Sequence, residues 1–93
     1  MGKAYVILTL RIMPASPDVD LGKLQINVDS AIKAFGGAGS TFETKPFAFG
    51  LKATEATFQI EESKGSAEPL ENEIKKIEGV ESVEVIRVDR ALG

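Results

Sequence analysis

The chain contains no cysteine, no histidine and no tryptophan. Without thiols or imidazoles it cannot form disulfides, iron–sulfur clusters, zinc sites built from cysteine or histidine, or any catalytic triad that depends on histidine. Much familiar enzyme chemistry is therefore excluded. We expect a protein that binds no metal and no cofactor of its own.

Long apolar runs and excess positive charge are also missing. No stretch approaches the length of a membrane span, and the start lacks the apolar core and cleavage site of a signal peptide. The net charge is −3 at pH 7, whereas a generic nucleic-acid binder carries a positive surplus. We therefore expect a cytoplasmic protein whose partner is a protein or a small molecule, with no membrane and no direct nucleic-acid contact.

A chain of 93 residues is long enough for one hydrophobic core, so we expect a single domain over residues 1–93. Alternating apolar residues predict strands, and three- and four-residue apolar spacings predict helices. The predicted strands are 4–13, 40–46, 51–61 and 82–88, and the predicted helices are 20–35 and 67–78. The order βαββαβ predicts an α+β, ferredoxin-like sandwich: a four-stranded antiparallel sheet with two helices on one face.

The same periodicity assigns side chains to the core and to the open face of the sheet. We expect the core to contain Val6, Leu8, Leu10, Leu24, Val28, Ile32, Phe58, Ile60, Leu70, Ile74, Ile77 and Val83. On the third strand Ala53, Glu55, Thr57 and Gln59 should face water. That face offers no aromatic platform for stacking bases, which argues against an RNA-recognition domain. The fold itself hosts many functions and selects none.

The most informative segment is Pro46-Phe47-Ala48-Phe49-Gly50-Leu51-Lys52, between the second and third predicted strands. Hairpin tips face water and are normally polar. Two apolar rings at such a tip have two explanations. Either they enter a partner, or they fold back over the edge of the core. The first explanation predicts that Phe49 is exposed in the free protein, whereas Phe47 could pack inward.

Three motifs carry a resemblance that extends over essentially the full length. They are the tip segment, Met13-Pro14 followed by Asp18-Val19-Asp20-Leu21, and Glu78-Gly79-Val80-Glu81-Ser82-Val83-Glu84-Val85. With these motifs at these spacings, the chain resembles the archaeal elongation factor one beta family. It is also similar to the C-terminal exchange domain of the eukaryotic counterpart.

The resemblance implies a translation factor, not an enzyme, that promotes exchange of GDP for GTP on elongation factor one alpha. That GTPase delivers aminoacyl-tRNA to the ribosome. Phe49 falls on the tip aromatic that the family inserts into the GTPase, and Pro46, Phe47, Gly50 and Lys52 surround it. Arg90 falls where eukaryotic members carry a lysine that reaches the magnesium and phosphate region. The guanidinium of arginine is a broad, planar fork of donors and the ammonium of lysine is a compact charge, so the two residues are not equivalent.

A second function stays open from the residues alone. The fold also serves small-molecule-sensing regulatory domains, which dimerise through sheet edges or the open face. Such a domain has no use for two exposed rings at a hairpin tip. The exposure of the tip therefore distinguishes the two functions.

Overall fold

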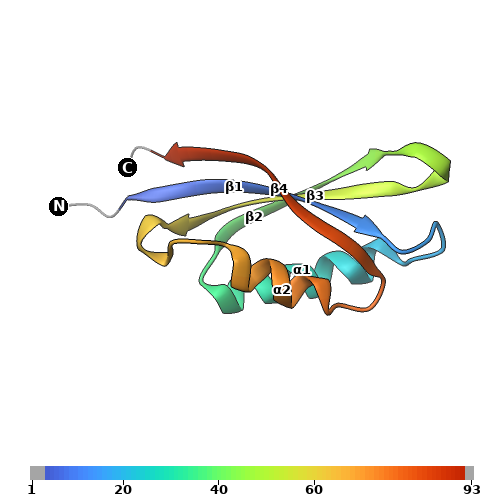
Figure 1. Cartoon of the computed structure of the whole chain (residues 1–93), viewed down its shortest axis with the longest axis horizontal. Helices are drawn as coiled ribbons and strands as arrows, with labels where there is room; N and C mark the ends of the chain where they lie inside the picture. The colour runs from blue at the N-terminus through green and yellow to red at the C-terminus, as the bar shows by residue number, and fades with distance from the viewer. Residues whose placement is uncertain (1–3, 92–93) are drawn as a thin grey trace.

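The computed structural model describes residues 4–91, which form one antiparallel sheet with both helices on the same face (Figure 1). The strands are β1 (Tyr5–Pro14), β2 (Ala38–Pro46), β3 (Lys52–Glu61) and β4 (Val80–Ala91), and the helices are α1 (Leu21–Phe35) and α2 (Glu68–Lys75). Two single turns, η1 (Ala48–Gly50) and η2 (Glu62–Lys64), flank β3. The strand order is β2-β3-β1-β4, which confirms the predicted ferredoxin-like arrangement.

The core lies between the helices and the sheet face that they cover. Leu10, Phe58 and Leu24 are almost fully buried there, with relative exposures of 0%, 1% and 2%. Two residues predicted for the core, Val6 and Ile77, are only partly buried and pack against its edge. The other predicted core residues are buried, so the apolar periodicity assigned the faces correctly.

Helix α1 has the ends that its sequence favours. The Asp20 carboxylate accepts a hydrogen bond from the Lys23 amide at 3.1 Å, which satisfies one of the free amides of the first turn. At the other end Gly36 has φ +104°, a left-handed conformation that suits glycine and closes the helix. Within residues 4–91 neither helix is long and apolar enough to cross a membrane.

The last helix and the last strand differ from the predicted bounds. Helix α2 ends at Lys75, because the chain then turns: the Ile77 amide donates to the Ile74 carbonyl at 3.0 Å, and Gly79 has φ +92°. Strand β4 extends beyond the predicted 82–88 at both ends. A register shift leaves Ile86 without a partner on β1, so the alternation of apolar residues reverses there. The residues missed by the prediction lie beyond this bulge, where Asp89 and Arg90 pair with Ile7 and Val6 of β1.

The two ends of the sheet are different. The described ends of the chain lie at one end, and the β2–β3 hairpin projects at the other (Figure 1). The pairing of β1 with β3 stops at Ile12–Thr54, whereas β2 and β3 stay paired up to Pro46–Lys52. The last part of the hairpin is therefore two-stranded and has no support from β1 pairing.

Candidate functional site

The hairpin tip, defined here as Pro46–Lys52, is closed by backbone hydrogen bonds. The Phe47 amide donates to the Leu51 carbonyl at 2.8 Å, and the Leu51 amide donates to the Ala48 carbonyl at 3.2 Å. Between them Phe49 and Gly50 both have positive φ, +62° and +74°. Positive φ at both central residues is the signature of a type I′ turn, which fits the right-handed twist of a hairpin.

Phe49 occupies a position where its side chain is disfavoured. It is the single non-glycine residue with positive φ among residues 4–91, and type I′ turns favour asparagine or glycine there. Its ring is 95% exposed, so no packing within the chain offsets the backbone strain. The predicted exposure of Phe49 is confirmed. The aromatic ring is therefore held outward at a strained position, without support from the rest of residues 4–91.

Phe47 behaves differently from Phe49. It is 47% exposed, and its ring lies 5.5 Å from the Arg11 guanidinium carbon, on the sheet face that the helices leave open. The ring thus folds back onto the sheet without entering the helix-covered core. The explanation that both rings cover the edge of that core is therefore wrong.

The remaining tip residues give the aromatic pair an exposed surround. Pro46, Gly50 and Lys52 are all exposed. Gly50 and Lys52 also border a hollow of about 150 Å³ whose other wall is the β1–α1 connection, including Pro14 and Pro17. The tip and the Met13-Pro14 motif, distant in sequence, are therefore neighbours at one end of the molecule.

Arg90 lies at the opposite end of the sheet. Arg90 and Ile60 both pair with Val6, and Ile60 is eight residues along β3 from Lys52. That separation corresponds to roughly 26 Å at the usual rise of a strand. Its guanidinium contacts the Glu62 carboxylate through Nη2 at 2.5 Å and Nε at 3.2 Å. The hydrogen bond and the charge of Glu62 raise the pKa of Arg90 above its usual value. The structure therefore brings five of the six predicted site residues together and leaves Arg90 apart.

The family of this chain is shown by its similarity to known proteins. The sequence model of the EF-1 guanine nucleotide exchange domain matches residues 7–91. This chain belongs to that family. Its relatives include proteins named elongation factor 1-beta from Methanocella arvoryzae, 44% identical over 95% of this chain and 98% of the relative, and from Methanosarcina barkeri, 38% identical over 91% and 96%. A relative of the same name from Staphylothermus marinus is 38% identical over 94% and 97%.

Sequence reasoning missed one feature of this exchange domain, a band of charges across the open face. Arg11 lies between Glu84 of β4 at 3.2 Å and Glu55 of β3 at 3.9 Å, and Lys45 of β2 lies between Glu55 at 3.9 Å and Glu43 at 3.6 Å. These five residues, the charged band, come from all four strands. Pairing Arg11 with both glutamates requires the strand register, which a single sequence does not provide.

One prediction about the open face is wrong. Ala53 was expected to face water, yet its exposure is 0%. Its neighbours along the strand, Lys52 and Thr54, point the other way, so the helices do not cover it. Side chains of the open face must therefore cover it, and its cross-strand neighbour on that face is Lys45.

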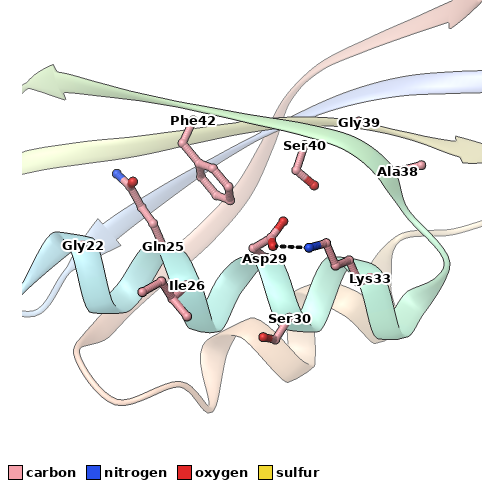
Figure 2. Close-up of a pocket in the computed structure, with 10 residues that line it drawn as sticks. All are labelled: Gly22, Gln25, Ile26, Asp29, Ser30, Lys33, Ala38, Gly39, Ser40 and Phe42. Carbon is pink, nitrogen blue, oxygen red and sulfur yellow. Dashed lines mark ion pairs between the residues drawn. The ribbon is translucent and has the colours of Figure 1, made fainter.

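The exchange domain also has a hollow of about 480 Å³ between α1 and β2 (Figure 2). Ser40 and Phe42 point into it from β2, Asp29 points toward them from α1, and Lys33 extends along α1 toward Asp29. Asp29 and Lys33 form an ion pair at 2.9 Å, and the hydrogen bond from Lys33 lowers the pKa of Asp29. None of the six predicted site residues lines this hollow. Among residues 4–91 no group of three or more acidic side chains is arranged to hold a metal ion.

Proposed function

We propose that this chain binds elongation factor 1-alpha in its nucleotide-bound state and accelerates the exchange of GDP for GTP. The observation that carries the proposal is Phe49: a strained, 95% exposed aromatic at the end of a hairpin in a chain of the exchange-domain family. We take residues 1–93 as one exchange domain that acts by binding, without covalent chemistry and without a cofactor. The alternative, a small-molecule-sensing domain, is not favoured by this family membership.

Exchange by this route needs only a difference in affinity. In GTPases, bound GDP is held by backbone amides, a lysine and Mg²⁺ around its phosphates. A factor that binds the loosened, nucleotide-poor conformation more tightly than the closed one shifts the population toward the loosened state. Insertion of Phe49 between elements of the GTPase would supply that difference, because the ring would gain contacts only in the conformation whose elements have separated, and at 95% exposure it has few contacts to lose on this chain.

Arg90 would act at a second point of contact. A cation near the metal site disfavours Mg²⁺ by repulsion, and Mg²⁺ helps to hold GDP. Arg90 is exposed and its ion pair with Glu62 is also exposed, a kind of pair that contributes little to stability. Arg90 could therefore leave Glu62 and contact groups on the GTPase at little cost in stability. Because Arg90 and the tip lie at opposite ends of a molecule 47 Å long, the GTPase would have to contact both ends.

The partner also implies where the chain works and what else it contacts. A factor for protein biosynthesis works where the ribosomes and the GTPase are, so we place the chain in the cytoplasm. We propose no contact of its own with nucleic acid or with a membrane. The net charge of −3 supports this, because phosphate-rich surfaces attract positively charged proteins.

The direct test is release of a fluorescent GDP from purified elongation factor 1-alpha, with excess unlabelled GTP. The chain should accelerate release in proportion to its concentration until the GTPase is saturated. Phe49→Ala should weaken the acceleration, whereas Lys33→Met, a change of an exposed α1 residue far from the tip, should not. Release at the intrinsic rate at every concentration of the chain would refute the proposed function.

A further inference from the structure

We propose that Arg11 is a positioning residue for the hairpin tip. Its guanidinium holds the Phe47 ring against the open face of the sheet, and this contact fixes the direction in which Phe49 projects. The inference rests on the proposed function, because the direction of Phe49 matters only if a partner receives the ring.

The contacts of Arg11 place it between the sheet and the tip. Its guanidinium lies 5.5 Å from the centre of the Phe47 ring, within the range of a cation–π interaction. The same group is fixed by Glu84 at 3.2 Å and Glu55 at 3.9 Å, on the two strands that flank β1. A planar guanidinium held by carboxylates on either side presents a defined face for the ring to stack on.

Burial on the open face shows that side chains pack over it near the tip. Ala53 lies on that face, in the same strand as Glu55, and is completely covered. The Nε atom of Arg11 is shielded from solvent and has no hydrogen-bond partner among the described residues. Leaving a buried donor without a partner is unfavourable. The Nε end of the Arg11 guanidinium is thus packed against its neighbours, while 31% of the side chain remains exposed.

The tip needs such support because it lies beyond the end of the pairing between β1 and β3. Beyond the Ile12–Thr54 pair the hairpin has no third strand, and an isolated two-stranded hairpin is marginally stable in water. The Phe47 amide donates the hydrogen bond to Leu51 that closes the tip, and Phe47 is two residues before Phe49. Holding the Phe47 ring to β1 through Arg11 therefore ties the turn that carries Phe49 to the rigid part of the sheet.

Loss of this contact should lower the fraction of molecules whose tip points in the productive direction. The apparent dissociation constant equals the intrinsic one divided by the competent fraction. For a cation–π contact of ordinary strength we expect Arg11→Met to raise the factor concentration that half-saturates GDP release roughly fivefold. The maximal release rate should change less than twofold, because the bound complex still contains Phe49.

The experiment has two readouts and a matched control. The first readout is the half-saturating concentration in GDP release, and the second is backbone order of the free chain at Ala48 and Gly50, from ¹⁵N relaxation. Arg11→Met should shift both, and Arg11→Lys, which retains the charge without the planar face, should fall between Arg11→Met and the parent. Arg87→Met is the control: it removes the same group from the same face, where Arg87 contacts Asp89 at 2.6 Å.

Phe47→Leu completes a double-mutant cycle. If Arg11 acts through the ring, adding Arg11→Met to Phe47→Leu should change the half-saturating concentration by less than twofold. The inference would be overturned if Arg11→Met had the same tip order and the same half-saturating concentration as the parent. It would also be overturned if both quantities shifted no more in Arg11→Met than in Arg87→Met. If even the parent fails to accelerate GDP release, the proposed function fails, while the relaxation measurement still decides whether Arg11 orders the tip. If Arg11→Met does not fold, the comparison of Arg11→Lys with the parent decides.

Discussion

Replacing Phe49 with alanine should separate binding from stability. The ring is 95% exposed, so folding buries only about a twentieth of it. For an aromatic side chain this amounts to roughly 10 Å². At about 25 cal/mol per Å² of apolar surface, the loss of folding free energy is about 0.25 kcal/mol. Alanine has the same positive φ to adopt, so the backbone strain is unchanged. For a domain of this size the thermal midpoint should fall by only about 1–2 °C.

Assisted nucleotide release should respond very differently. Aromatic anchors often contribute about 2 kcal/mol or more to binding, which corresponds to a loss of affinity of about 30-fold. The assay is release of fluorescent GDP across a range of factor concentrations, beside thermal unfolding of the same samples. Phe58→Leu is the buried counterpart: Phe58 is 1% exposed, so this variant should lose about 1 kcal/mol of stability and keep its assisted release.

Two results would refute this reasoning. A fall of the midpoint by more than about 8 °C in Phe49→Ala would mean that the ring supports the fold, since that corresponds to more than about 1 kcal/mol. An unchanged half-saturating concentration would mean that the ring is no anchor. In the second case the strain at Phe49 would have to be explained by something other than partner contact.

Further variants test the fold, the strain and the charges. Phe49→Gly should be more stable than Phe49→Ala by about 1 kcal/mol in urea unfolding, because glycine tolerates positive φ. Leu10→Ala, at a site with 0% exposure, should cost about 2–5 kcal/mol by the same method. Arg90→Ala should reduce assisted GDP release with folding intact, and a Mg²⁺ titration should show the defect shrinking when free Mg²⁺ is scarce. The pKa of Asp29 is lowered by Lys33, so the contribution of their pair to stability should be full at neutral pH and disappear as the pH falls through the acidic range; unfolding of parent and Asp29→Asn across pH measures this.

The fold could be predicted because its signals are local. The stripe of Leu24, Val28 and Ile32 lies on one side of a helix, and the alternation in β1 needs no knowledge of its neighbours. Strand β4 was predicted too short, because the polar residues Asp89 and Arg90 lie in the strand through their pairing with Ile7 and Val6 of β1. Pairing is not a local property of the sequence.

The candidate site was predictable only in part for the same reason. Phe49 could be identified because an apolar residue beside glycine in a tip is unusual wherever the rest of the chain lies. The contact of Phe47 with Arg11 joins residues of β1 and the tip, and the pair of Arg90 with Glu62 joins β4 to the turn after β3. Only the assembled sheet brings these residues together. A charged residue on an open sheet face is too common in sequences to be recognised as a support for a distant ring.

The hairpin tip extends beyond the last residue pair shared by β1 and β3. Amides of this two-stranded extension should exchange with deuterium through local opening, at a lower free energy than those in the centre of β1, which are released only when the whole domain unfolds. If the tip binds the partner as proposed, mutations there can alter recognition without lowering the stability of the core, and mutations in the core can be selected for stability alone. The two properties can evolve separately in this chain, although it has only one sheet and one core.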